Sequence, residues 1–330
     1  MEVLRTARGL TQMQLAEKTG ISQAALSKLE ANTVPLDDER ASTIAAALDV
    51  PVSLLGERIG DGARIYHRKR ASLPITADKR IRATALMLQA QVSSLLGTSK
   101  PALTLTKRPL PMDHLYTPAD RAREARADLG LGTGPIINLV SVLEAAGVLV
   151  VRDDLKTLQV DAIAVWPEGT SPVVFLSDQA PADRQRFTAA HELGHAVMHD
   201  IPSENQEREA DEFAAEFLMP RKSILPELDD ISFGHLVQLK AKWGVSIAAL
   251  ARRAVDLNKM TDRQFRNFNI HMASTGMNRV EPQPLAPEHP SLVGRFIRDQ
   301  LDSGSSIDRL AQSAQMTRNS FTQQFALEMS

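Results

Sequence analysis

The 330-residue sequence contains no cysteine, few aromatic residues and no long apolar run. Without cysteine there are no disulfides, no thiolate zinc sites and no cysteine nucleophiles, so any metal must be held by histidine, aspartate or glutamate. Aromatic residues make up only 4% of the chain, which favours aliphatic helix packing over a large β-sandwich. No segment approaches the roughly 20 apolar residues that span a bilayer, and the start, MEVLRTARGL, lacks the apolar stretch of a signal peptide. These absences predict a cytoplasmic protein with no membrane partner.

The composition is otherwise that of a globular protein, with 43% hydrophobic and 24% charged residues. A chain of this length is expected to form two or three domains. The net charge is −2, but residues 61–82 carry seven basic residues against two acidic ones. This basic strip is interpreted either as a phosphate-binding surface or as a solvated linker. Its basic residues are Arg64, Arg68, Lys69, Arg70, Lys79, Arg80 and Arg82.

The first fifty residues have the pattern of three short helices. Thr11 can cap a helix that Gly20 ends, and Ser22 can cap a second helix directly after it. Two short helices joined by a turn with glycine are the helix-turn-helix layout. A third helix is expected over 38–48, where acidic residues favour the amino end through the helix dipole.

The run LTQMQLAEKTGISQAALSKLE, residues 10–30, resembles the Cro/CI-type (XRE) repressor domain along its length. The resemblance implies that a double-stranded DNA operator is a partner. Glutamine can pair bidentately with adenine, and lysine can reach guanine or phosphate. The same fold also serves in dimerisation or protein binding, so protein contact alone is the alternative. A homodimer is expected, because repressor domains usually read two half-sites. The residues implied to face the major groove are Gln12, Gln23, Ala24, Ser27 and Lys28.

The stretch HELGHAVMHD, residues 191–200, contains the pattern H-E-x-x-H. On a helix, His191 and His195 lie one turn apart on one face and can share a metal. Glu192 is then placed to take a proton from a bound water. Because the pattern also occurs by chance, the surrounding sequence has to support a metal site.

The region around this motif is predicted to be α+β. A helix over 135–147 is followed by apolar strands, and the last two of these are expected to form a hairpin. The strands lead into a helix over 181–200 that carries the motif, an order typical of zincin-type peptidases. The predicted strands span 148–153, 160–167 and 171–177.

Zinc needs a third protein ligand. His199 continues the histidine row but drifts from it near the helix end, so it is interpreted as a capping or supporting residue more readily than as a ligand. The metzincin pattern is excluded, because the glycine and histidine that it needs after His195 are missing. The next helix offers Glu207 as a ligand, with Asp211 one turn later to accept the spare N–H of a ligand histidine. The other acids of that helix are interpreted as a solvated face: Glu209, Glu212 and Glu216.

Two ordered motifs, RQRFTAAHELGHAVMH at 184–199 and EREADEFAAEFLMP at 207–220, resemble the ImmA/IrrE-type zinc metallopeptidases. Asp211 stands where that family often has asparagine. A His–His–Glu site also suits manganese or iron, so zinc is expected without excluding Mn²⁺ or Fe²⁺. The site that the resemblance implies has His191, His195 and Glu207 as metal ligands, Glu192 as general base and Asp211 beside the ligands.

The resemblance implies peptide hydrolysis by a transcriptional regulator. Such a protein would cut a repressor-type partner and so relieve repression under stress or induction. Glu192 would pass the water proton to the leaving amine, and Tyr116 or His199 would serve the oxyanion. Two other functions stay open. One is a transcription factor whose zincin domain senses or binds a partner without proteolysis, and the other is an antitoxin that binds a toxin.

The expected fold is multidomain and mainly α with α+β. An all-α helix-turn-helix domain comes first, followed by a central zincin-like metallopeptidase domain with a small sheet and a helical carboxy-terminal region of unknown role. Within that last region SIDRLAQSAQMTRNSF, residues 306–321, is faintly similar to a further helix-turn-helix. The predicted boundaries are 1–57 for the first domain, 58–134 for a basic linker and helical connector, 135–258 for the zincin-like domain and 259–330 for the remainder.

Overall fold

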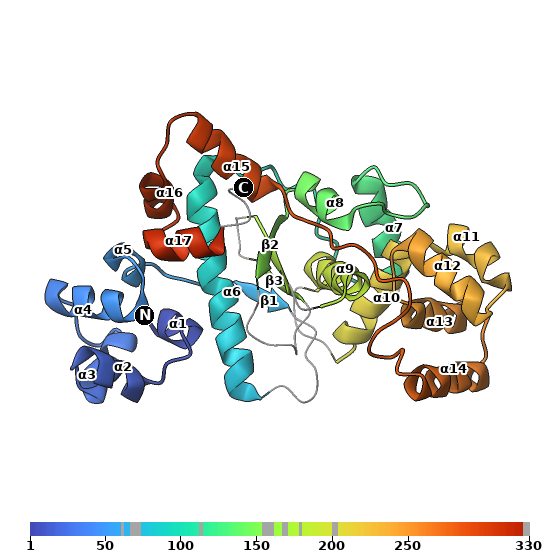
Figure 1. The fold of residues 1–330 in the computed structure, drawn as a ribbon, viewed down its shortest axis with the longest axis horizontal. Helices are drawn as coiled ribbons and strands as arrows, with labels where there is room; N and C mark the ends of the chain where they lie inside the picture. The colour runs from blue at the N-terminus through green and yellow to red at the C-terminus, as the bar shows by residue number, and fades with distance from the viewer. Residues whose placement is uncertain are drawn as a thin grey trace.

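The computed structural model describes residues 1–60, 63–66, 74–111, 115–153, 162–166, 171–177, 180–199 and 204–325. These residues are mostly helical and surround one four-stranded sheet (Figure 1). The arrangement confirms the predicted fold class of mainly α with α+β. None of the helices in these ranges is long and apolar enough to cross a membrane.

The amino-terminal helices form an all-α unit. Thr11 and Gln14 make a capping box, and Ser22 accepts a hydrogen bond from a backbone N–H in the first turn of the following helix. The helices are α1 (Glu2–Ala7), α2 (Gln12–Thr19), α3 (Gln23–Glu30), α4 (Asp38–Leu48) and α5 (Val52–Leu55). The predicted third helix is confirmed as α4. The core of this unit includes Leu4, Leu15, Leu26, Ile44 and Leu48.

The sheet has the strand order β1-β3-β4-β2. Its strands are β1 (Arg64–Tyr66), β2 (Leu149–Asp153), β3 (Ala162–Trp166) and β4 (Val173–Ser177). β3 runs antiparallel to both β1 and β4, whereas β2 runs parallel to β4. The three predicted strands are confirmed, and the predicted hairpin connection at 168–170 lies outside the described residues. β1 comes from the segment predicted as a connector.

Successive side chains of the central strands point to opposite faces of the sheet, so the sheet separates two cores. One face packs against α8 (Leu139–Ala145) and α9 (Ala182–Met198) through Val150, Ala164, Val174 and Leu176. The other face packs against α6 (Ile75–Leu96) and the carboxy-terminal helices through Val151, Ile163, Val165 and Phe175. Those helices are α15 (Leu292–Asp302), α16 (Ile307–Ser313) and α17 (Arg318–Gln324).

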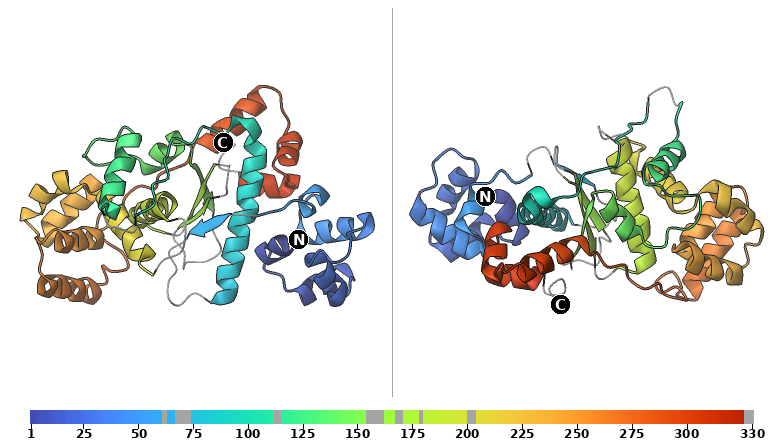
Figure 2. Two further views of the ribbon diagram at one scale, coloured as in Figure 1. Left: turned by 180° about the vertical axis from the view of Figure 1, so that it is seen from behind. Right: turned by 90° about the horizontal axis from the view of Figure 1, so that it is seen from above.

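The long helix α6 lies between the amino-terminal unit and the sheet (Figures 1 and 2). Its Ala83 and Met87 belong to the amino-terminal core. Its Ile81, Ala85, Leu88 and Val92 belong to the core on the sheet. α6 therefore contributes to two cores at once. In the basic strip, Lys79, Arg80 and Arg82 lie on this helix, and Arg68, Lys69 and Arg70 lie outside the described residues.

The remaining helices gather on the far side of α9. They are α7 (Pro118–Asp128), α10 (Gln206–Leu218), α11 (Arg221–Ile224), α12 (Phe233–Trp243), α13 (Ile247–Asp256) and α14 (Asp262–Ser274), with the 3₁₀ helix η2 (Leu225–Asp229). The 3₁₀ helix η1 (Gly97–Ser99) directly follows α6. From α14 the chain returns across this layer to α15. Glu281 binds the buried Lys240, and Glu288 binds the buried Arg186. The carboxy-terminal region is therefore packed on both halves of the molecule.

Candidate metal centre

α9 carries the H-E-x-x-H motif and is buried along almost its whole length. It lies between the sheet and α10, so its polar side chains are held away from water. His191 and Glu192 are 0% exposed and His195 is 2% exposed. Buried polar side chains of this kind require partners, because an unpaired one costs roughly 1–3 kcal/mol.

Glycine at position 194 allows α10 to lie close to α9. A Cβ atom on Gly194 would stand 3.0 Å from Cγ and Cδ1 of Phe213, closer than ordinary packing permits. This close approach brings the first turn of α10, with Glu207, to the two histidines of the motif.

The side chains of His191, His195 and Glu207 form a small triangle of ligand atoms. The two Nε2 atoms are 3.0 Å apart. That of His191 lies 3.4 Å from Oε2 of Glu207, and that of His195 lies 3.4 Å from Oε1 of the same carboxylate. A tetrahedral zinc ion with bonds of about 2.0–2.1 Å separates neighbouring ligand atoms by about 3.3 Å. The two nitrogen–oxygen distances match that separation, and the nitrogen–nitrogen distance is slightly shorter. The donor set and its dimensions therefore fit a metal ion of this size.

Asp211 orients the first histidine. Its Oδ1 lies 2.8 Å from Nδ1 of His191, so the carboxylate accepts that N–H and leaves Nε2 facing the triangle. Burial lowers the pKa of His191, but its hydrogen bonds to Asp211 and Glu207 outweigh burial and raise it to about 9. Hydrogen bonds from His191 and His195 hold the pKa of Glu207 far below its usual range. The triangle is thus an environment that favours a positive charge.

A second chain of contacts supports the other histidine. Nδ1 of His195 lies 3.0 Å from Nδ1 of His199, whose Nε2 lies 2.9 Å from Glu209. Burial lowers the pKa of His199, which favours its neutral form. A neutral His199 that donates to Glu209 accepts the N–H of His195 and leaves Nε2 of His195 for the triangle. His199 therefore supports a candidate ligand, as its place near the helix end predicted.

The interpretation of Glu209 and Glu216 as a solvated face was wrong. Glu209 binds His199, and only 20% of its side chain is exposed. Glu216 is 2% exposed and binds Arg253 and Arg123. These partners lie 10 to 93 positions away in sequence, beyond the reach of helical periodicity. Glu212 is half-buried, and burial raises its pKa.

The two candidates for the oxyanion role have other contacts. Tyr116 is 46% exposed, and its ring centroid lies 4.3 Å from the guanidinium carbon of Arg121. His199 uses both ring nitrogens on His195 and Glu209. The oxyanion role stays a prediction for both residues.

The predicted DNA contacts lie mostly on one exposed face. Gln23, Ala24, Ser27 and Lys28 are all exposed on α3. Gln12 differs, because its side-chain amide donates to Glu30 at 2.7 Å and is partly buried. The structure therefore keeps four of the five predicted residues together and turns the fifth toward the protein.

Comparison with known families matches both parts of the chain. Residues 143–255 match the family model of the M78 peptidases described as the IrrE N-terminal-like domain. Residues 1–55 match a helix-turn-helix family model. The chain joins a helix-turn-helix domain to an IrrE-like domain. The resemblance found in the sequence is thereby confirmed, and a search of curated proteins gives no match.

The matched segment of the IrrE-like domain includes α9 and α10, and with them the whole ligand triangle. The domain has a metallopeptidase-type fold. The helix-turn-helix match supports DNA binding. Together they indicate a regulator with a peptidase-like domain.

Proposed function

We propose that this protein is a DNA-binding regulator whose IrrE-like domain is a zinc-dependent endopeptidase. Its substrate is a repressor-type helix-turn-helix protein, and cleavage relieves repression under stress or induction. The observation that supports the proposal best is the triangle that the buried His191 and His195 form with the exposed Glu207, beside the buried Glu192. Its dimensions suit a tetrahedral ion with one position left for water.

The protein residues have distinct roles in this proposal. A zinc ion in the triangle would supply Lewis-acid activation of water and of the scissile carbonyl. Glu192 directly follows the candidate ligand His191 on α9, and its side chain is buried. It takes the proton of the attacking water and delivers it to the leaving amine. Asp211 and His199 hold the two rings in the tautomers that keep Nε2 for the metal.

The deciding experiment compares host cells that express wild type or the Glu192→Gln variant. Newly formed protein amino termini are mapped by mass spectrometry, at rest and under stress. We expect a new terminus inside one repressor-like protein only with wild type. Glu212→Gln is the matched control, because it makes the same chemical change on α10 outside the triangle and should cleave like wild type.

The opposite outcome separates the remaining functions. If Glu192→Gln produces the same termini and the same regulation as wild type, hydrolysis is not the function. A stable complex with a toxin and no new termini would indicate an antitoxin. Regulation without cleavage or complex would indicate a transcription factor whose IrrE-like domain acts as a sensor.

Metal binding is tested on the purified full chain. We expect about one metal ion per protein, as a single three-ligand site implies. Glu207→Ala should lose most of it, while Glu204→Ala, two residues before α10, should retain it. Elemental analysis distinguishes zinc from manganese or iron.

DNA binding by the amino-terminal unit has its own test. The double variant Gln23→Ala, Lys28→Ala should weaken operator binding in a gel shift by several kcal/mol at most. An unchanged gel shift would exclude base reading by α3. Sedimentation of the DNA complex would show whether a homodimer occupies two half-sites.

A further inference from the structure

The carboxy-terminal helices α16 and α17 repeat the layout of α2 and α3. The N-cap residues Thr11 and Ser22 of the first pair are eleven positions apart, as are Ser306 and Thr317 of the second. Each of these four side chains accepts a hydrogen bond from the backbone N–H three residues later, at 3.1–3.3 Å. The two pairs can therefore be compared position by position.

The turns and the buried positions also correspond. Gly20, with φ of 70°, and Gln315, with φ of 52°, both lie two residues before the second cap in the left-handed region. Glutamine has no intrinsic preference for that conformation, so its occurrence indicates that the surrounding fold requires the turn. The buried counterparts are Leu15 and Leu310 on the first helices, and Leu26 and Phe321 on the second helices.

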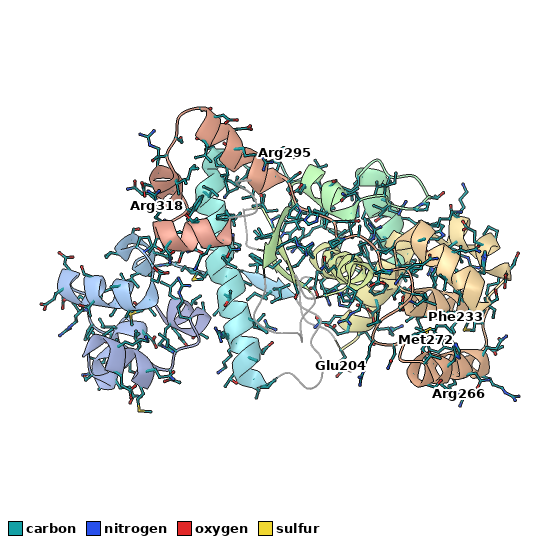
Figure 3. The ribbon with its side chains drawn as sticks, in the orientation of Figure 1. Glu204, Phe233, Arg266, Met272, Arg295 and Arg318 are labelled. Carbon is teal, nitrogen blue, oxygen red and sulfur yellow. The ribbon has the colours of Figure 1, made fainter. Side chains whose placement is uncertain are left out.

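The exposed positions of the second helices match as well. On α3 the exposed residues predicted to reach DNA are Gln23, Ala24, Ser27 and Lys28. Their counterparts on α17 are Arg318, Asn319, Thr322 and Gln323, and all four are exposed. Figure 3 labels Arg318 at the end of α17 that lies away from the sheet.

We infer that α16 and α17 form a second unit that reads double-stranded DNA, with the exposed face of α17 in the major groove. The residue types suit that role, because arginine pairs with guanine, asparagine and glutamine pair with adenine, and the threonine methyl group contacts thymine. Arg318 forms an ion pair with Asp308, but 63% of each side chain is exposed. Exposed pairs contribute little stability, so DNA can displace this one.

A different side of α17 fixes the second unit against the first. The hydroxyls of Thr317 and Ser320 donate to Asp49, at the end of α4, at 3.0 and 2.6 Å. These contacts leave the exposed face of α17 uncovered. The inference is independent of the metal site and adds a second reading element to the DNA binding proposed for α3.

The test selects ligands for the full chain from a random library of double-stranded DNA. We expect wild type to enrich sites with two separate sequence elements. The variant Arg318→Ala, Asn319→Ala should lose one element, and the variant Gln23→Ala, Lys28→Ala should lose the other. On a duplex with both elements, each lost base contact should weaken binding by roughly 5- to 150-fold.

The matched control is Gln312→Ala, Ser313→Ala, which changes two exposed residues of α16 outside the proposed face. It should select the same sites as wild type, and thermal melting should show that every variant is folded. If the α17 variant enriches the same two elements with wild-type affinity, the second reading unit is excluded whatever the α3 variant does. If wild type enriches no sequence at all, DNA reading by either unit is excluded, and the peptidase proposal is unaffected.

Discussion

The first and last turns of α10 both place carboxylates against nitrogen-bearing side chains, but in opposite settings. At the first turn Glu207 is 57% exposed and faces the buried histidines of α9. At the last turn Glu216 is 2% exposed and lies between Arg253 of α13 and Arg123 of α7. Asp211, between them, keeps 43% of its side chain exposed while it binds His191.

This difference in exposure and partners distinguishes Glu207, a candidate metal ligand, from Glu216, which stabilises the fold. An arginine side chain is always positively charged, so the buried carboxylate of Glu216 is already neutralised by Arg253. The histidines beside Glu207 are cationic only when protonated, so a metal ion can replace their proton. Accessibility also differs, because the Glu207 side chain at the first turn is open to solvent and the Glu216 side chain at the last turn is buried. The same residue type on one helix therefore serves the fold at one end and the candidate site at the other.

The largest expected effect is a loss of folding stability in the variant Glu216→Gln. It leaves Arg253 buried without its anion, and breaking a buried pair costs about 3–5 kcal/mol. Denaturant unfolding of the metal-free protein measures this loss. The control Arg123→Ala removes the half-exposed partner and should cost no more than about 1 kcal/mol. Equal losses from both variants would contradict the structural role given to the buried pair.

Asp211→Ala should act on metal affinity instead of stability. Loss of the group that orients a ligand histidine typically lowers metal affinity 10- to 100-fold. Competition with a chromophoric chelator measures the affinity. Asp211→Asn is the conservative partner, since an amide oxygen also accepts the N–H of His191, and it should retain more affinity than alanine. An affinity equal to wild type in both variants would exclude the orienting role.

Glu209→Gln should also lower metal affinity, but by less than Asp211→Ala. Glu209 reaches the triangle only through His199 and then His195, so its loss should lower metal affinity by less than about tenfold. His199→Phe removes the middle of this chain and should have the larger effect of the two. If Glu209→Gln lowered metal affinity more than Asp211→Ala does, the proposed ranking of the two supporting carboxylates would be wrong.

The smallest effect is a gain of stability from Glu212→Gln. Burial raises the pKa of Glu212, so its charged form is less stable in the folded than in the unfolded protein. The variant should be more stable by less than about 0.5 kcal/mol at neutral pH. The gain should vanish below pH 4.5, where the carboxyl group is protonated in both states, and should grow as the pH rises through the raised pKa. A gain that persists at low pH would point to a cause other than charge.

The sequence predicted the elements whose signals are local. Caps and acidic first turns defined α2, α3 and α4, and apolar runs defined β2, β3 and β4. The proximity of Glu207 to the histidines followed from two ordered motifs, and the structure brings them together. The roles of these residues in metal binding and catalysis stay proposals.

Contacts between distant residues could not be predicted in this way. Glu209 and Glu216 have the spacing of a solvated helix face, and only the folding of α9, α7 and α13 around α10 gives them partners. The role of His199 as a support was accessible, because it continues a row of histidines four residues apart. β1 has too few residues for a recognisable period, so the sheet was predicted without it.

The double packing of α6 also affects how the amino-terminal unit is turned relative to the sheet. At about 100° per residue, the stripe that includes Ile81 and Leu88 lies roughly 150° around the helix from the stripe of Ala83 and Met87. The phase of one helix thus helps to set the angle between the two partners, together with the hydrogen bonds of Thr317 and Ser320 to Asp49. Because the two stripes alternate along the same turns, a single inserted residue would turn the later positions by about 100° relative to the earlier ones and disrupt both stripes. Variation among natural relatives should therefore spare the length of this helix even where its exposed residues change freely.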